Sequence, residues 1–271
     1  MKSASNEVRR ARPLLGTFVD ITAQGADEAD LHSAIDRAFA AIERVHRLMS
    51  FYDLMSEVGR INRDAFRRNV LVHPWTWRVL KAAQRFARES GGVFDVTAAR
   101  SSSGNWRDIV LEENRTVRFR RSVSVDLGGI AKGFAVDRAV EKLKQNSVVN
   151  GIVNAGGDIC VFGSTSRLVH LRSPASPSQF CAMLRLRNRA VATSAIYFVP
   201  DALIDGRSRR GLTSPISVTV SARDCMTADA LTKIVFALRE KVAPLLKLYR
   251  ADALILDRNG SPGWTFHTHA A

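Results

Sequence analysis

Apolar positions along the chain recur with two periods, one typical of strands and one typical of helices. The segment "GTFVDITAQ" alternates apolar and polar residues, which predicts a strand over Thr17–Thr22. From Leu31 to Met49, apolar residues recur every three or four positions, which predicts an amphipathic helix of about six turns. A second helix is predicted from Pro74, a residue suited to a first helical turn, up to Gly91 and Gly92.

The remaining segments are richer in strand patterns than in helix patterns. Between the two helices, "SFYDLMSEVGRIN" is expected to form a loop with a short turn, and "VLVH" a strand. Farther on, "VLEENRTVRF" predicts a hairpin, "GIVNAGGDICVFG" two strands about a glycine pair, and "ISVTV" and "DALILD" single strands. More strands are predicted at Leu168–Arg172, Cys181–Leu186 and Ala190–Thr193, and residues 197–214 are expected to form a loop. The segment "VDLGGIAKGFAVDRAVEKLKQ" predicts a strand followed by a helix, and "MTADALTKIVFAL" predicts another helix.

These strands outnumber the helices and do not alternate with them regularly, which argues against a Rossmann or barrel fold. The predicted fold class is therefore α+β, a single compact unit of mixed or antiparallel sheets with packed helices. No repeat or linker divides the sequence. We expect a disordered basic segment over residues 1–11, one domain over 12–262 and a flexible tail over 263–271.

Composition is that of a globular protein, with 46% hydrophobic and 24% charged residues among 271. No apolar run approaches the roughly 18–20 residues of a membrane-spanning helix. The first residues, "MKSASNEVRRARP", are polar and basic and lack the apolar core of a secretory signal. We therefore expect a cytoplasmic protein, or an exported one if the natural N-terminus is longer. The three cysteines are widely spaced, which predicts neither a disulfide framework nor a zinc site.

A formal net charge of +14 raises nucleic acid as a partner. However, the basic residues are spread along the chain, and the densest runs are only "RFRR" at 118–121 and "RSRR" at 207–210. This distribution favours an attraction for small anionic ligands over a nucleic-acid surface, and we expect no nucleic-acid partner.

Three glycines and a lysine surround the predicted start of a helix in "VDLGGIAKG". A helix N-terminus has unpaired N–H groups and partial positive charge, glycine lets a ligand approach the backbone, and Lys132 adds a full charge. Phosphate or pyrophosphate would suit this place, and Asp126 would suit a ribose or ribityl hydroxyl or a metal. The alternative is a tight turn with a solvated lysine.

Two other segments carry candidate chemistry. In "VNAGGDI" the glycine pair is better explained as a structural feature of a strand than as a binding site. In "CMTADALTK", Asp229, Thr232 and Lys233 share one face of the predicted helix. Asp229 alone is best explained as a helix cap, whereas Asp229 and Thr232 together offer the hard oxygens that Mg²⁺ prefers.

Taken together, these fragments resemble the ApbE-like flavin transferases, the FAD:protein FMN transferases. The fragments that carry the resemblance are, in order, "LLGTFV", "SFYDLMSEVGRIN", "VFDVT", "VDLGGIAKGFAVDRA", "VNAGGDI", "AVATS" and "CMTADALTK". They extend from Arg12 to about Leu256. Each is weak alone, but their shared order and spacing are specific. The resemblance implies an ApbE-like, T-fold-like architecture.

Members of that family bind FAD and Mg²⁺ in one cleft, transfer the FMN half to a threonine or serine hydroxyl of another protein, and release AMP. The resemblance thus implies an enzyme whose substrate is FAD, whose metal is Mg²⁺ and whose partner is an acceptor flavoprotein. The residues that it places against FAD are Leu15, Tyr52, Val93, Phe94, Asp95, Asp126, Lys132 and Ile204. It implies Mg²⁺ ligands at the Gly129 carbonyl and the Asp229 carboxylate, with Thr232 beside them, and catalytic roles for Asp229 and Lys132.

Two segments depart from the family pattern. The family has a threonine four residues after the aspartate, where this chain has Lys233. Either the lysine replaces part of the metal's charge or Thr232 shifts into place, although one residue is about 100° of helix rotation. The family's histidine is Ala202 here, in "ALIDGRSRRG", and its proline is Gly206. If that histidine activates the attacking hydroxyl, another base, such as Asp205 or Asp229, would have to serve.

These departures leave two alternatives to transfer. The site would hydrolyse FAD to FMN and AMP, or it would hold FAD without turnover. A basic nucleic-acid-binding protein is a third, less favoured hypothesis.

Overall fold

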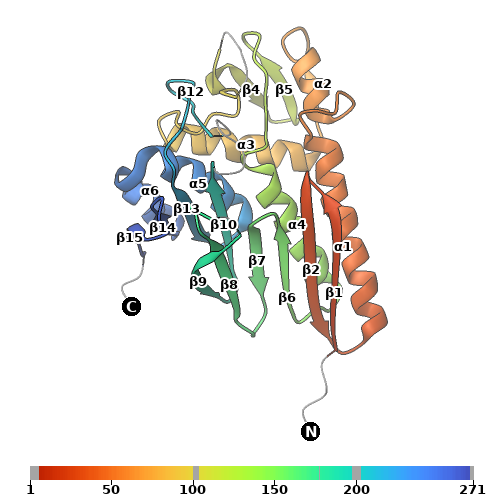
Figure 1. Ribbon diagram of the computed structural model, residues 1–271. Coiled ribbons are helices and arrows are strands. Elements are labelled where there is room, and N and C mark those ends of the chain that lie inside the picture. The colour runs from red at the N-terminus through yellow and green to blue at the C-terminus, as the bar shows by residue number, and fades with distance from the viewer. Residues whose placement is uncertain (1–5, 100–103, 177, 197–202, 269–271) are drawn as a thin grey trace.

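A computed structural model of the chain describes residues 6–99, 104–176, 178–196 and 203–268. Its centre is an eight-stranded sheet in the order β1-β2-β6-β7-β10-β13-β14-β15, with every neighbouring pair antiparallel. Figure 1 shows helices behind this sheet and the β8–β9 hairpin in front of it. The strands are β1 (Asn6–Leu14), β2 (Thr17–Gly25), β6 (Asn150–Ala155), β7 (Asp158–Phe162), β10 (Arg189–Ala195), β13 (Ser217–Ala222), β14 (Asp252–Leu256) and β15 (Pro262–Phe266).

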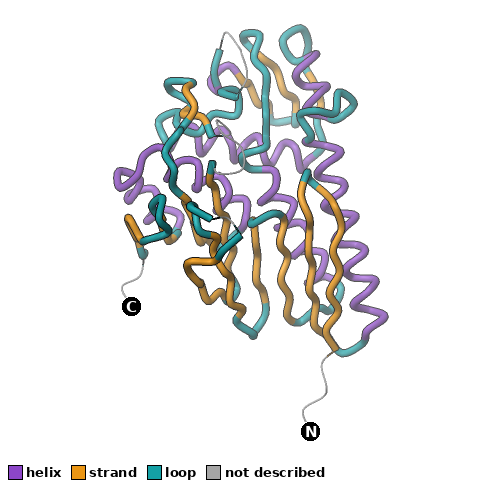
Figure 2. The backbone as a smooth tube through the Cα atoms, viewed as in Figure 1, coloured by secondary structure: helices purple, strands orange, loops and turns teal. Residues whose placement is uncertain are grey.

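Long helices form the layer behind the sheet (Figure 2). Helix α1 packs beside α4, and α4 packs beside α5. The apolar face of α1 is fully buried, as its periodicity predicts, and Asp27 caps the first turn by accepting a hydrogen bond from the Asp30 N–H at 2.9 Å. The helices are α1 (Glu28–Met49), α2 (Glu57–Asp64), α3 (Pro74–Glu89), α4 (Ala131–Gln145), α5 (Cys225–Leu238) and α6 (Ala243–Tyr249), with short 3₁₀ turns at Trp106–Asp108 and Arg239–Val242.

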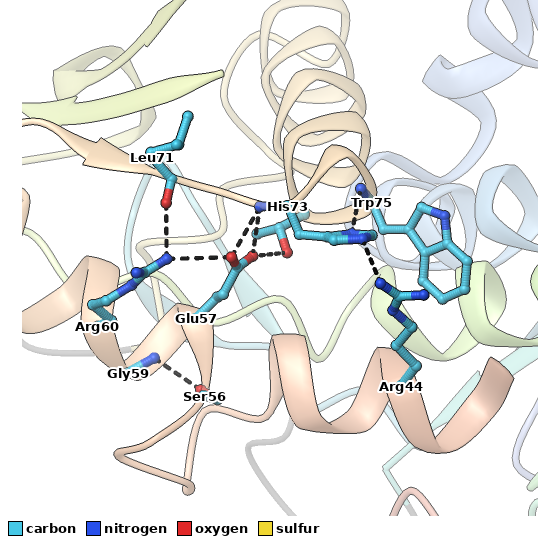
Figure 3. Close-up of polar contacts among 9 residues, drawn as sticks. Arg44, Ser56, Glu57, Gly59, Arg60, Leu71, His73 and Trp75 are labelled. Carbon is cyan, nitrogen blue, oxygen red and sulfur yellow. Dashed lines mark hydrogen bonds and ion pairs between the residues drawn. The ribbon is translucent and has the colours of Figure 1, made fainter. Parts of the chain in front are cut away.

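A small sheet, β3-β5-β4, lies with α2 and α3 at one end of the molecule (Figure 1). Its strands are β3 (Val70–Leu71), β4 (Ile109–Glu112) and β5 (Thr116–Phe119). The Glu57 carboxylate joins α2 to α3, because it accepts hydrogen bonds from the His73 N–H and the Thr76 hydroxyl (Figure 3). His73 in turn caps α3 through the Trp75 N–H and contacts Arg44 of α1.

The front of the main sheet is covered by the hairpin of β8 (Arg167–Arg172) and β9 (Phe180–Leu186). A separate apolar cluster joins this hairpin to β7 and β10, and consists of Ile159, Val161, Val169, Leu171, Leu186 and Val191. A short pair of strands, β11 (Ile204–Asp205) and β12 (Arg210–Gly211), completes the fold. None of the helices in the described ranges combines the length and the apolar character needed to cross a bilayer.

The predicted α+β class, a single compact unit, is confirmed, but some boundaries are corrected. Residues 6–11, expected to be disordered, belong to β1, because their backbone pairs with β2. Residues 263–266, expected in a flexible tail, pair with β14 in β15. The segment 57–64, expected to be part of a loop, is helix α2 with Ser56 as its cap. The strand expected before α4 is absent from the described backbone at residues 123–126, which belong to no sheet.

Candidate functional site

A cavity of about 1470 Å³ opens between the layers. The segment 93–99 and the start of α4 form one wall, and the front of the sheet forms another, with Ile152, Ile159 and Val191 among its residues. The β8–β9 hairpin closes a third side with Leu168, His170, Arg172 and Phe180. Because these walls come from distant segments, the cavity exists only in the folded chain.

Helix α4 begins at this cavity without a side-chain cap from its own first residues. Its unpaired N–H groups therefore need another acceptor. The Gly133 N–H donates to the Asp229 carboxylate of α5 at 3.0 Å. In return, the Asp137 carboxylate of α4 accepts from the Cys225 and Met226 N–H groups at the start of α5, at 2.8 and 2.9 Å. Each helix thus supplies a carboxylate that caps the other, which fixes both N-terminal ends at one place.

Gly133 makes this arrangement possible. A Cβ atom at this position would lie 2.3 Å from the Cys225 carbonyl oxygen and 2.8 Å from the Asp229 Cβ. The backbones of α4 and α5 therefore meet too closely for any side chain. The third glycine of "VDLGGIAKG" serves helix packing rather than the approach of a ligand.

Lys132 lines the cavity and pairs with Asp158, with 2.6 Å between the ammonium and the carboxylate. Desolvation acts against the charged form, but the carboxylates of Asp158 and Asp229 raise the pKa of Lys132 above its ordinary value. The lysine is therefore protonated. Its side chain keeps 36% of its surface exposed, whereas that of Asp158 keeps 2%. Lys132, and not Asp158, therefore lines the cavity.

Lys233 repeats this arrangement on α5. Its ammonium contacts a carboxylate oxygen of Asp229 and donates to the Asp229 carbonyl at 3.0 Å. Burial acts against the ionised carboxylate, but Lys233 and Lys132 hold the pKa of Asp229 below its ordinary value. Asp229 is fully buried, whereas Lys233 lines the cavity.

The structure gathers most of the predicted FAD contacts on this cavity. The predicted residues that line it are Val93, Phe94, Asp95, Asp126, Lys132 and Ile204, and Gly129 lies among them. Asp229 bonds to Gly133, the neighbour of Lys132, so the two residues lie close together, although Asp229 itself is buried behind the cavity lining. Their roles toward FAD stay predictions.

Two predicted contacts lie away from the cavity lining. Leu15 is in the turn between β1 and β2 with φ of 57° and packs against the main core. Tyr52 is 83% exposed in the segment before α2, where its ring meets Phe51 edge-on at 5.5 Å. A contact of either residue with FAD stays a prediction. Ala202, where the family has histidine, lies outside the described residues.

The two residues expected as substitute bases are both held in ion pairs. Arg207 donates to both carboxylate oxygens of Asp205, at 3.0 and 2.6 Å, and these bonds lower the pKa of Asp205. The Asp229 carboxylate accepts hydrogen bonds from the Lys233 ammonium and the Gly133 N–H. A carboxylate with a lowered pKa is a weak base.

Sequence reasoning missed the part played by Asp158. The glycine pair of "VNAGGDI" does have a structural role, because Gly156 and Gly157 turn from β6 to β7 with φ of 64° and 100°. Both glycines also line the cavity, and the acid that follows them pairs with Lys132. The sequence does contain a signal for this role, which is the acidic residue directly after the glycine pair. No comparable pattern marks the hairpin residues that form the third wall.

The predicted Mg²⁺ ligands Gly129, Asp229 and Thr232 do not fit a divalent ion in this arrangement. Mg²⁺ requires octahedral oxygens at about 2.0–2.1 Å. One carboxylate oxygen of Asp229 contacts the Lys233 ammonium, and the other accepts from Gly133. The Thr232 hydroxyl bonds to the Asp229 carbonyl and to Ser194, each at 2.7 Å. In the described ranges no group of three histidine, cysteine, aspartate or glutamate side chains is placed to hold a metal.

Curated relatives cover nearly the same length as this chain. An FAD:protein FMN transferase of Klebsiella pneumoniae (strain 342) is 24% identical over 283 residues, with 91% of this chain and 88% of the relative covered. One from Treponema pallidum (strain Nichols) is 26% identical, with 92% and 84% covered.

Solved structures have the same fold. The crystal structure of the ApbE protein from Thermotoga maritima matches with a TM-score of 0.85 and 26% identity, over 95% of this chain and 96% of that one. The apo form of the flavinyl transferase ApbE from Pseudomonas stutzeri matches with a TM-score of 0.81 at 19% identity, over 97% and 95%.

The sequence model of the ApbE family matches residues 15–255, which is most of the chain. This span includes both capped helices, the glycine turn and the strands that wall the cavity. The chain therefore belongs to the ApbE family.

Proposed function

We propose that this protein is an FAD:protein FMN transferase, which moves the FMN half of FAD onto a threonine or serine hydroxyl of an acceptor protein and releases AMP. The relatives that bear this name support flavin transfer. The observation that carries the proposal for this chain is that two lysines from two helices, Lys132 and Lys233, line one large cavity.

The cavity has the chemistry that a flavin dinucleotide needs. The ammonium groups of Lys132 and Lys233 and the N-terminal end of α4 supply positive charge for the diphosphate. Phe94, Leu168 and Phe180 supply apolar and aromatic surface for planar rings. A volume of about 1470 Å³ exceeds the roughly 300–1,000 Å³ of an ordinary small-ligand pocket, which leaves room for an acceptor side chain beside FAD.

In the proposed reaction, the acceptor oxygen forms a bond to the phosphorus of the FMN half. The bond from that phosphorus to the bridging oxygen breaks, and AMP departs with the electron pair. Such a transfer depends mainly on positioning and on stabilising charge on the phosphate oxygens. Lys132 and Lys233 provide that stabilisation from fixed positions. The hydroxyl proton passes to the departing AMP phosphate or to water, because the lowered pKa of Asp205 makes this residue a poor acceptor for it.

The test is to incubate the protein with FAD, with and without an acceptor flavoprotein, and to measure AMP by chromatography. We expect AMP to form together with flavin covalently bound to the acceptor. AMP formed equally well without any acceptor would show hydrolysis instead, and bound flavin with no AMP would show a carrier. Salt-sensitive binding of DNA or RNA without any flavin binding would support the nucleic-acid hypothesis.

A further inference from the structure

We propose that the Lys233 ammonium is the resident cation of this site and replaces a divalent metal at Asp229, so that FAD binds without Mg²⁺. This inference rests on the proposed function, because it concerns the same cavity and the same diphosphate. It differs from what the family resemblance implies, and it follows from the contacts of one side chain.

The position of Lys233 between a carboxylate and the cavity is the first argument. The Asp229 side chain is completely buried, whereas the Lys233 side chain is 18% exposed and lines the cavity. A ligand in the cavity therefore meets the ammonium before it meets the carboxylate. Asp229 holds the ammonium in place rather than contacting the ligand.

The space that Lys233 occupies is the second argument. A Cβ atom on Gly129 would lie 3.7 Å from the Lys233 Cε, so the lysine stem passes beside the Gly129 backbone on its way to Asp229. Gly129 and Asp229 are the two groups expected to bracket Mg²⁺. A side chain that already carries positive charge fills the space between them. A metal ion in contact with the same carboxylate would face strong repulsion from that charge in a buried site.

The donor count of the ammonium is the third argument. A lysine ammonium has three N–H donors, and two of them reach the carboxylate and the carbonyl of Asp229. The third N–H donor has no other partner among the described residues and is available to a phosphate oxygen. Lys233 therefore meets the two requirements of a phosphate-neutralising cation, which are charge and access.

The spacing along α5 explains why the residue at position 233 determines which cation lies next to the Asp229 carboxylate. Residues four apart lie on one helix face, so a side chain at 233 projects beside the Asp229 carboxylate. The Lys233→Thr variant would remove the ammonium and place a hydroxyl oxygen there. Asp229 would lose its cation and gain a neighbour suited to Mg²⁺.

The experiment measures the FAD dissociation constant of the wild-type protein and of Lys233→Thr by quenching of flavin fluorescence, each in EDTA and in millimolar MgCl2. For the wild type, we expect the same dissociation constant in both buffers. For Lys233→Thr in EDTA, we expect a dissociation constant at least about tenfold higher, as for the loss of a charge-assisted contact. Added MgCl2 should restore most of that loss in the variant and change nothing in the wild type.

The matched control is Lys247→Thr, which removes an exposed lysine on α6 and should bind FAD like the wild type in both buffers. Wild-type binding that collapses in EDTA would overturn the inference while leaving the proposed function intact. That comparison needs no variant to fold. Lys233→Thr that binds FAD normally in EDTA, or that MgCl2 fails to rescue, would also contradict it. Absence of FAD binding by the wild type in both buffers would instead reject the proposed function.

Discussion

The charged residues of this site form ion pairs in which the lysine side chain is more exposed than its acidic partner. Lys132 with Asp158 and Lys233 with Asp229 each place an acid in the interior and an ammonium on the cavity wall. An unpaired buried carboxylate is costly, so each acid needs its lysine in the free protein. Each ammonium remains available to an incoming anion. The pairs therefore keep the empty cavity electrically balanced and still present positive groups to a ligand.

The Lys132→Ala variant tests one of these ammonium groups. We expect the FAD dissociation constant to rise by roughly 10- to 150-fold, because a hydrogen bond to a charged group is worth about 1.5–3 kcal/mol. Isothermal titration calorimetry would measure it. Lys81→Ala, which removes an exposed lysine of α3, is the control and should not change the affinity. Equal affinities for the two variants would show that Lys132 does not contact the diphosphate.

At the scale of elements, the site depends on how α4 meets α5. The reciprocal caps of Asp229 on α4 and Asp137 on α5 fix the two N-terminal ends side by side. Burial and the nearby Asp224 carboxylate raise the pKa of Asp137 to about 7, whereas the two N–H groups that it caps act in the opposite direction. This crossing places Lys132 and Lys233 on one cavity.

The Gly133→Ala variant should disrupt that crossing. Alanine normally favours a helix over glycine by about 1 kcal/mol, but the added Cβ would overlap backbone atoms of Cys225 that have no freedom to move away. We expect the free energy of unfolding to fall by about 1–3 kcal/mol, the usual cost of overpacking. Urea denaturation followed by circular dichroism would measure the loss.

Gly129→Ala provides the matched control for this change. A Cβ at Gly129 meets only side-chain atoms, with the nearest at the ordinary distance of 3.6 Å from the Phe94 ring. The stability of this variant should stay close to that of the wild type. If both variants are equally stable, the helices do not meet as closely as the structure shows.

The hydrophobic pattern of the sequence predicted most helices and strands, but not which of them pair or pack together. The buried stripe of α1 and the cap at Asp27 are local features, so the helix was predicted nearly to its ends. The strand β1 was missed because its basic residues hide the alternation of an edge strand, whose outer side faces solvent. Helix α2 is only eight residues long, too short for a period to be read with certainty.

The whole molecule forms the cavity, because the main sheet, the β8–β9 hairpin, the 93–99 segment and two helices all contribute walls. Unfolding removes every one of these walls together. A ligand that fits the cavity therefore binds the folded state alone, and its binding energy adds to the stability of the fold. The net charge of +14 acts at the same scale, as a general attraction for anions.

FAD should accordingly raise the melting temperature. At a concentration of 100 times its dissociation constant, a ligand adds about 2.7 kcal/mol, which corresponds to roughly 5–10 °C for a protein of this size. Differential scanning fluorimetry read through tryptophan emission would measure the shift. Riboflavin, which lacks the diphosphate, should produce a much smaller shift at the same concentration. A short DNA duplex that shifts the melting temperature as much as FAD would contradict a site specific for a dinucleotide.

The sequence is enough to establish the periods of the elements, local caps such as Asp27, the order of the family fragments and the identity of the charged residues. Those properties depend on neighbours within a few positions, where spacing fixes geometry. Which charged groups form ion pairs depends on the folded chain. Asp229 caps a helix 96 residues away, and Lys132 pairs with an acid 26 residues away. The choice of Lys233 as the partner of Asp229 within one helix also depends on the tertiary structure, because burial by α4 and the cavity wall leaves that carboxylate no solvent to face.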